Sequence, residues 1–251
     1  MKRDDLVAYL DEYLQVATIQ DSSNNGLQVE GSENITHIAF AVDAGQAAFE
    51  GAAAAAAEML IVHHGLFWGR PLMVTGIQRR RLAQLIEGGV SLYAVHLPLD
   101  LHSEVGNNAT LARWLDLEEV APFGEYKEQV IGLAGSLAEP LTRNQFVARV
   151  ETALGKAIIQ VWPFGPDTVR RVGIISGGGG SFMDQAGDAN LDLYLTGELS
   201  HQVYHQAREL GLNVVYGGHY ATETAGLKAL ASHLADRFGL ETTFLDLPTG
   251  A

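Results

Sequence analysis

Three histidines and two carboxylates stand where secondary structure is predicted to end or begin. They are His63, His64, Asp100, His219 and Glu223. Imidazole nitrogen and carboxylate oxygen together are good ligands for zinc, iron, manganese, cobalt or nickel, and a poorer match to calcium or magnesium. The chain has no cysteine, which excludes thiolate ligands. These residues therefore point to a metal site built from nitrogen and oxygen.

His63 and His64 directly follow the apolar run EMLIV, which predicts a short buried strand. Functional groups gather at the carboxyl ends of strands in open α/β sheets. Adjacent strand residues point to opposite faces, so both rings reach one site only if the chain turns, which Gly65 permits. Two neighbouring ions, each taking one imidazole, suit this arrangement. A hydrogen-bonded strand terminus is the ordinary structural alternative.

Asp100 closes the segment VHLPLD, which is predicted to be an extended strand end because Pro98 restricts the residue before it. An Asp there is also a common turn residue. His219 and Glu223 are four residues apart at the start of a predicted helix, and this spacing places them on one face. A Glu at a helix N-terminus also has an electrostatic explanation.

The combination favours a dinuclear centre over scattered structural residues. A carboxylate can bridge two divalent ions about 3.5–4 Å apart, with a hydroxide held between them. Two ions, less the charges of Asp100, Glu223 and the hydroxide, leave about one positive charge at the site. We therefore expect an anionic small molecule, carrying a phosphate or carboxylate, to bind there.

The chain as a whole is strongly acidic, with 16 basic and 30 acidic residues and a formal net charge of −14. Such a field repels nucleic acid and anionic membranes at long range, which argues against either as a partner. The opening residues lack the apolar core of a secretory signal. No apolar run approaches the roughly 18 residues that cross a membrane. A cytoplasmic protein is expected.

Apolar strands alternate with amphipathic or alanine-rich helices along most of the chain. This alternation predicts an α/β fold with two related subdomains, largely parallel sheets flanked by helices, and the metal site in the cleft between the subdomains. Residues 1–121 form the first subdomain, with His63, His64 and Asp100. Residues 122–251 form the second, with His219 and Glu223, an α+β character near its start, and a C-terminal helix that packs back on the first.

The two halves have matching intervals. Val42 ends a predicted strand 21 residues before His63, and Ile175 ends one 21 residues before Thr196. Each interval holds a helix and a strand and is followed by a glycine. This indicates a remote internal duplication.

Two other patterns are weaker. His201 and His205 have helical H-x-x-x-H spacing, but QVY between them lacks the general-base Glu of H-E-x-x-H. His205 is interpreted as structural, and His201 as a candidate outer group or acid–base residue. The run SGGGGS lacks the third glycine of G-x-G-x-x-G and any following G-K-[ST], so a nucleotide-binding loop is not favoured. His96 and His102, beside Asp100, are candidate outer groups, although neither has a signal of its own.

Several segments resemble one family in order along the chain: MLIVHHGLFWG, AVHLPLDLHSEVGNNATLARWL, YLTGELSHQ and VVYGGHYATETAGLKALA. The family is GTP cyclohydrolase I type 2-like, also called NIF-three-like, and the chain is similar to its compact form without a mid-chain inserted domain. The resemblance implies a dinuclear metal centre on His63, His64, Asp100, His219 and Glu223, with Glu223 bridging.

The same resemblance implies a toroidal homohexamer with metal sites facing an internal cavity. The family name implies opening of the guanine ring of GTP. Two hypotheses on function follow. The first is a metal-dependent hydrolase that uses a metal-bridging hydroxide. The second is a non-catalytic metal-binding hexameric scaffold, metal store or insertion factor.

Overall fold

The computed structural model describes residues 1–250 and consists of two compact units. Unit 1 comprises Met1–Gly106 and Gly226–Leu247, and unit 2 comprises Asn107–Ala225 with the last few residues of the chain. Helix α9 (His219–Phe238) contributes its first residues to unit 2 and the remainder to unit 1. Ala251, the last residue of the predicted second subdomain, lies outside the described residues.

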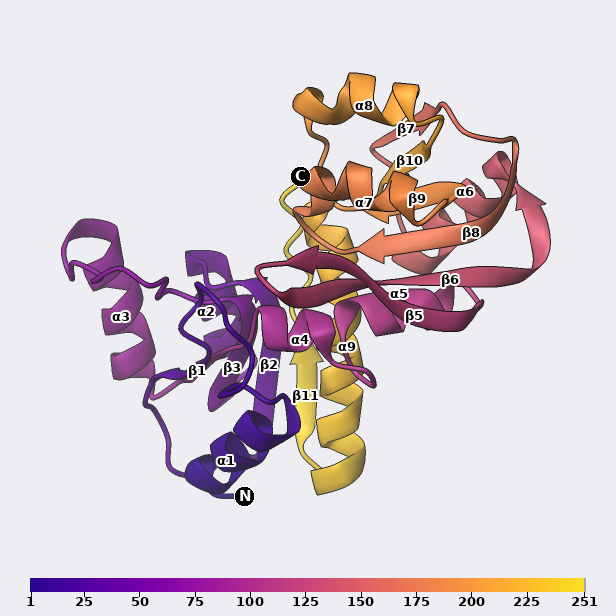
Figure 1. The fold of residues 1–251 in the computed structure, drawn as a ribbon. Helices are drawn as coiled ribbons and strands as arrows, with labels where there is room; N and C mark the ends of the chain where they lie inside the picture. The colour runs from indigo at the N-terminus through magenta and orange to yellow at the C-terminus, as the bar shows by residue number, and fades with distance from the viewer. Residues whose placement is uncertain (251) are drawn as a thin grey trace. The chain divides into compact units, whose positions relative to one another are not determined.

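Unit 1 is built on a five-stranded sheet of order β1-β4-β3-β2-β11 (Figure 1). The strands are β1 (Gly26–Val29), β2 (His37–Asp43), β3 (Met59–His64), β4 (Ser91–Ala94) and β11 (Glu241–Phe244). Strands β4, β3, β2 and β11 pair in parallel, and β1 pairs with β4 antiparallel. The helices are α1 (Arg3–Tyr13), α2 (Gln46–Ala54), α3 (Gly76–Gly88) and the short α4 (Leu97–Leu101).

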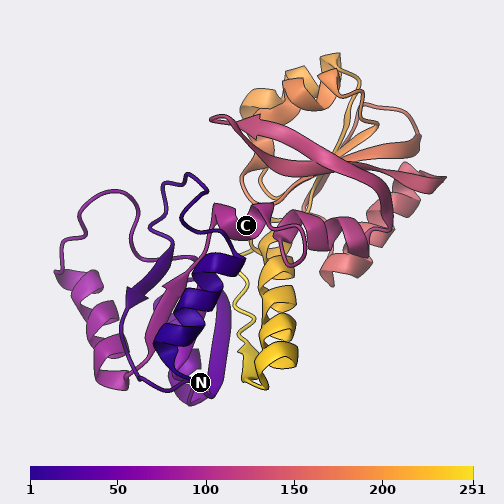
Figure 2. The same ribbon diagram turned by 60° about the horizontal axis from the view of Figure 1, so that its bottom comes forward.

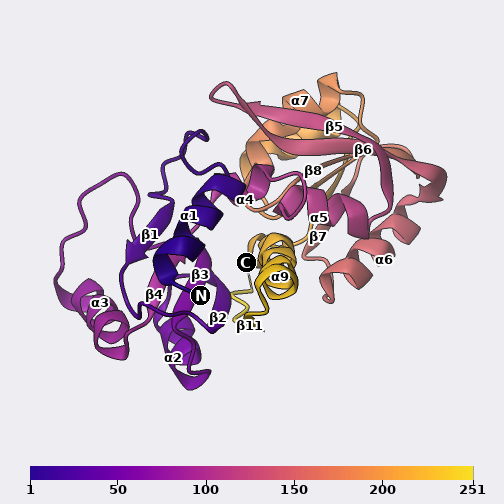
Figure 3. The same cartoon turned by 90° about the horizontal axis from the view of Figure 1, so that it is seen from below.

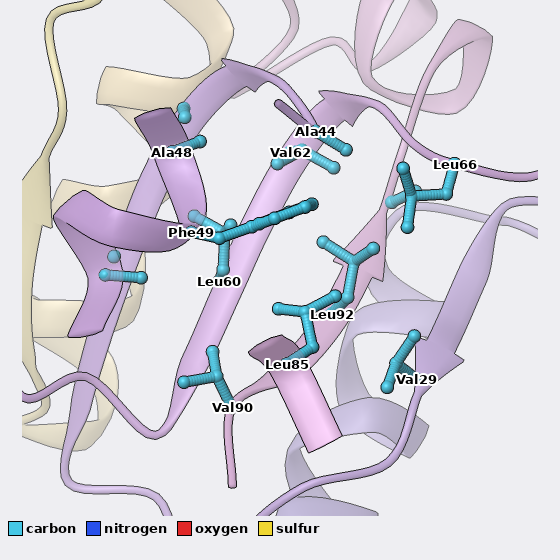
Figure 4. Packing of buried hydrophobic residues seen from close by; sticks show 14 of the residues in the cluster. Val29, Ala44, Ala48, Phe49, Leu60, Val62, Leu66, Leu85, Val90 and Leu92 are labelled. Atoms are coloured by element: carbon cyan, nitrogen blue, oxygen red, sulfur yellow. The ribbon is translucent and has the colours of Figure 1, made fainter. Parts of the chain in front are cut away.

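Helices cover both faces of this sheet, so its central strands are almost continuously apolar, as parallel strands buried on two sides must be. Figure 3 shows α2 and α3 on one side and α1 with the unit 1 part of α9 on the other. Phe49 of α2 and Leu85 of α3 pack against Leu60, Val62 and Leu92 of the strands (Figure 4). Alanines of α2 let this helix approach the sheet closely.

Unit 2 contains a six-stranded sheet of order β5-β6-β8-β9-β10-β7. The strands are β5 (Leu117–Tyr126), β6 (Gln129–Thr142), β7 (Gln160–Pro163), β8 (Thr168–Ile175), β9 (Leu193–Thr196) and β10 (Asn213–Tyr216). Strands β8, β9 and β10 are parallel, whereas the β5–β6 hairpin and β7 add antiparallel pairs.

Helices also cover both faces of the second sheet (Figure 2). Helices α5 (Asn107–Trp114) and α6 (Arg143–Leu154) bury Leu111 and Phe146 against one face. The other face is covered by the 3₁₀ turn η1 (Gly179–Phe182) and helix α7 (Met183–Asp188), and by the turn η2 (His201–Val203) and helix α8 (Tyr204–Glu209).

The predicted fold class, α/β with two sheets flanked by helices, is confirmed. The first sheet is largely parallel. The second is mixed, because residues 117–142 form a long antiparallel hairpin before the β-α-β rhythm returns. Among residues 1–250, the helices are all too short or too polar to cross a membrane.

Candidate metal centre

Strand β3 carries two imidazoles at its carboxyl end. His63 is fully buried and His64 is half-buried, and their ring centroids are 4.7 Å apart. The following Gly65 is required by close packing, because a Cβ atom there would lie 2.5 Å from the Cβ of Ala94 and 2.5 Å from Nε2 of Gln28. The close packing of Ala94 and Gln28 therefore holds the carboxyl end of β3 in one position.

An oxygen acceptor faces Nδ1 of each ring. Nδ1 of His63 lies 2.9 Å from the carbonyl oxygen of Val95, and Nδ1 of His64 lies 2.8 Å from Oδ1 of Asp43. A carbonyl or an ionised carboxylate only accepts, so Nδ1 carries the hydrogen and donates it. In the neutral rings Nε2 then has the lone pair that a metal ion needs, which is the usual arrangement of ligating histidines.

Asp100 lies beside His63, but the predicted element around it was wrong. Strand β4 ends at Ala94, and Asp100 lies in the short helix α4, where Pro98 occupies the first turn. Proline is tolerated there because the first helical N–H groups have no partner within the helix. The carboxylate is buried, and its Oδ2 lies 3.6 Å from Nε2 of His63. The helix therefore supplies the oxygen that the strand was expected to supply.

His96, named from the sequence only as a candidate outer group, is a third imidazole beside this pair. His63, His64 and His96 each have a potential ligand atom within 4.8 Å of the other two, so this group could hold a metal ion. The ring of Trp68 stands edge-on to His96 at 5.1 Å.

A buried carboxylate in the polar loop before β1 fixes His96. Nδ1 of His96 lies 3.0 Å from both oxygens of Asp21, and its backbone N–H donates to Oδ1 of Asn25. Burial alone would raise the pKa of Asp21, but hydrogen bonds from His96, Asn25 and Ser23 lower it to about 2. An Asp and two Asn within five loop residues were the only local signal of this cradle.

In unit 2, His219 opens helix α9 and faces Glu223 one turn later, as the spacing predicted. Nε2 of His219 lies 3.0 Å from Oε1 of Glu223, which is buried, and Nδ1 lies 2.6 Å from Oε1 of Glu198. The hydrogen bond and charge of Glu223, with those of Glu198, raise the pKa of His219 to about 9 against the opposing effect of burial. Both ring nitrogens thus face carboxylate oxygens.

The glycine run passes against the same pair. Gly177 has a φ of +60°, and a Cβ atom there would lie 2.1 Å from Oε1 of Glu223 and 3.2 Å from Nε2 of His219. Its carbonyl oxygen accepts the N–H groups of Gly197 and Glu198, each at 3.0 Å. The run SGGGGS and the segment Thr196–Glu198 are therefore parts of one cradle around His219 and Glu223.

The H-x-x-x-H pair does not form a site. His201 begins η2, His205 lies in α8, and both are exposed. The ring of His205 stands edge-on to the ring of Tyr204, with their centroids 5.3 Å apart. Among residues 1–250, the potential metal-holding groups do not contain His201 or His205. An acid–base role for His201 stays a prediction.

Comparison with known proteins gives one family. The model of the family described as Duf34/NIF3 (NGG1p interacting factor 3) matches residues 1–250. A protein named GTP cyclohydrolase 1 type 2 homolog from Deinococcus radiodurans is 44% identical over 99% of this chain and 94% of its own length. One of the same name from Pyrococcus horikoshii is 45% identical over the full length of both chains.

Solved structures agree with this match. The chain aligns over its full length with the protein ybgI, described as of unknown function, with a TM-score of 0.91 and 39% identity. TTHA1606 from Thermus thermophilus aligns equally well, with a TM-score of 0.91 and 46% identity over both full chains. Reduced HcgD from Methanocaldococcus jannaschii is similar over 98% of both chains, with a TM-score of 0.85 and 28% identity.

Proposed function

Because this chain belongs to the Duf34/NIF3 family, we propose that it binds two divalent metal ions and acts as a metal-dependent hydrolase. The proposed ligands are His63, His64, Asp100, His219 and Glu223, with Glu223 bridging the ions. One observation carries the proposal. The Nδ1 atoms of His63, His64 and His219 each face an oxygen acceptor, so Nε2 is the atom that would bind metal. In His219 the ion would replace the proton that Nε2 shares with Glu223.

The donor set fits zinc, iron, manganese, cobalt or nickel, which accept mixed imidazole and carboxylate ligation. Bound ions would activate a water molecule as a nucleophile and polarise the bond that it attacks. Within the protein, buried Asp100 and Glu223 offset part of the positive charge. The net charge that remains would attract an anionic group. The name of the relatives from Deinococcus radiodurans and Pyrococcus horikoshii makes GTP the first substrate to test.

Metal analysis tests the binding step. After reconstitution with zinc or manganese and removal of excess metal, we expect about two ions per chain. His63→Ala and Glu223→Ala should each lower this value, because each removes a ligand. His205→Ala is the matched control, because it removes an exposed histidine outside the proposed set. A firm value near zero for the unaltered protein would overturn the proposal.

Turnover is tested separately. The metal-loaded protein is incubated with GTP and a small set of phosphoesters and amides, beside Glu223→Ala and His205→Ala. Hydrolysis that Glu223→Ala abolishes, and that inorganic phosphate inhibits, supports the enzyme. Stoichiometric metal with no turnover across the set would instead favour the non-catalytic alternative, a scaffold, metal store or insertion factor.

The family resemblance also implies assembly, and we extend the proposal to a toroidal homohexamer in the cytoplasm. The acidic charge of −14 leaves many exposed carboxylates, so association should strengthen as salt screens their repulsion. Light scattering at physiological salt should give a mass of about six chains. A monomer at every concentration tested would contradict the hexamer without affecting the metal proposal.

A further inference from the structure

Two carboxylates outside the proposed ligand set contact ligand imidazoles in the same way. Asp43 accepts from Nδ1 of His64 at 2.8 Å in unit 1, and Glu198 accepts from Nδ1 of His219 at 2.6 Å in unit 2. In each case the carboxylate precedes its histidine by 21 residues. The two units thus repeat one contact with different acidic residues.

The backbone explains why the spacing is the same. Asp43 ends β2 directly opposite His64 at the end of the parallel strand β3. In unit 2, β9 and β10 are paired through Thr196 and Tyr216. Beyond these strands Gly217 and Gly218 donate to the carbonyl oxygens of Thr196 and Gly197. These hydrogen bonds continue the pairing past the ends of the strands, so Glu198 and His219, the next residues of the two segments, lie beside each other. Each contact is therefore made between the carboxyl ends of two adjacent parallel strands.

Fold stability does not account for these contacts. The side chain of Asp43 is 48% exposed and that of Glu198 is 55% exposed. Ion pairs with partners this exposed contribute little to stability, because water and salt screen them. A half-exposed carboxylate can still determine which nitrogen of a neutral imidazole carries the hydrogen. An ionised carboxylate only accepts, so it selects the form that has its hydrogen on Nδ1.

We infer that Asp43 and Glu198 are positioning residues of the metal centre: each fixes the ring orientation of one ligand imidazole, and Asp43 also fixes the tautomer of His64, so that Nε2 faces the metal. This inference rests on the proposed metal centre. The charge of each carboxylate also strengthens the ligand, because it stabilises the imidazole when Nε2 donates to a cation. The roles are parallel, one in each unit, although only Glu198 lies in a segment that carries the family resemblance.

The variants are Asp43→Ala and Glu198→Ala, with Asp43→Asn and Glu198→Gln as conservative partners. An amide oxygen can still accept from Nδ1 but carries no charge. Matched controls are Asp4→Ala and Asp167→Ala. Each control removes one exposed acidic partner of an arginine, Arg3 and Arg143 respectively, and touches no imidazole.

The measurement is Co²⁺ titration, followed by competition with a chelator and by the visible absorption spectrum. Each alanine variant should bind Co²⁺ about 10–100-fold more weakly, with an altered spectrum. The amide variants should recover part of the affinity, and the controls should match the parent. In metal-free protein, ¹⁵N chemical shifts of His64 should change from the Nδ1–H form to a mixture of tautomers in Asp43→Ala.

The outcomes distinguish the positioning role from the metal centre. Parent-like affinity, spectra and ¹⁵N shifts in the alanine variants would show that the contacts are only surface ion pairs, and would overturn the positioning role while the metal centre stands. Equal loss in the alanine and control variants would show a general charge effect and would also overturn it. A parent protein that binds no Co²⁺ would overturn the metal centre and the positioning role together.

Discussion

Gly177 is so close to Glu223 that a Cβ atom on the glycine would lie 2.1 Å from Oε1 of the carboxylate. Cβ atoms do not occur at such a distance from a neighbouring atom, so a side chain at residue 177 must displace Glu223 or the glycine run. The glycine is required here both by this contact and by its φ of +60°, which side chains rarely adopt. The backbone itself thus forms one wall around a proposed ligand.

We therefore predict that Gly177→Ala binds both metal ions more weakly. The measured value is the number of ions retained after gel filtration, which should fall well below about two per chain, because Glu223 is proposed to be a ligand of both ions. Gly155→Ala is the control: its φ is +67°, but nothing lies within 4 Å of its Cβ position. The control has the same backbone strain without the contact. Equal metal content in both variants would contradict the prediction.

His96 gives the second prediction. It is held by Asp21 next to His63 and His64, yet it is outside the five proposed ligands. We expect His96→Ala to keep the full metal content and to weaken the binding of inorganic phosphate to metal-loaded protein about tenfold, the effect of losing one hydrogen bond.

Calorimetric titration with phosphate measures this change, and Asp21→Ala should have a similar but smaller effect, because it releases the ring without removing it. His205→Ala is the control for loss of an exposed histidine. Loss of one ion in His96→Ala would show instead that His96 is itself a ligand, and the five-residue set would need revision.

The core of unit 1 gives the third prediction. Phe49 is 1% exposed and packs between α2 and the central strands (Figure 4). Phe49→Ala removes most of this buried ring, which costs about 3–5 kcal/mol of unfolding free energy. Met73→Ala, at a residue 72% exposed, should change it by less than about 0.5 kcal/mol. Urea denaturation of metal-free protein measures both, and similar values for the two variants would contradict the packing described.

Strand ends were the part of the site that could be predicted from the sequence. MLIV and VVY are apolar runs that are buried in β3 and β10, so the histidines after them were expected at the carboxyl ends of strands. Asp100 was misplaced because VSLYAVHLPLD is apolar for most of its length, and periodicity cannot show that the strand stops at Ala94. Pro98 fits an extended segment and a first helical turn equally well.

The carboxylates around the imidazoles could not have been found in the same way. Asp21 reaches His96 across 75 residues, and Asp43 and Glu198 reach their histidines across 21. These contacts depend on which strands become neighbours in a sheet, and local spacing does not report that. For the same reason His96 could be named only as a candidate outer group, because its local sequence shows nothing of the loop that holds it.

The final prediction concerns pH and is independent of the metal centre. His233 of α9 stacks on Tyr13 of α1, with ring centroids 4.4 Å apart, and its Nε2 contacts the hydroxyl of Tyr9. Partial burial and the nearby Arg237 lower the pKa of His233 below its ordinary 6.5, although Glu104 and Asp236 oppose the shift. The fold therefore favours neutral His233. The contribution of neutral His233 to the unfolding free energy is fully present above the unfolded-state pKa of about 6.5. It is lost as pH falls through the lower folded-state pKa.

As pH falls from 7 to 5, the unfolding free energy of the metal-free parent should decrease relative to that of His233→Phe, because only the parent loses the contribution of neutral His233. Phenylalanine keeps a ring against Tyr13 and has no proton to gain. The difference between parent and variant isolates His233 from the other histidines, which titrate equally in both proteins. His205→Phe, at an exposed residue, should keep the slope of the parent. If the unfolding free energies of the parent and of His233→Phe change in parallel as pH falls, the folded state does not favour neutral His233.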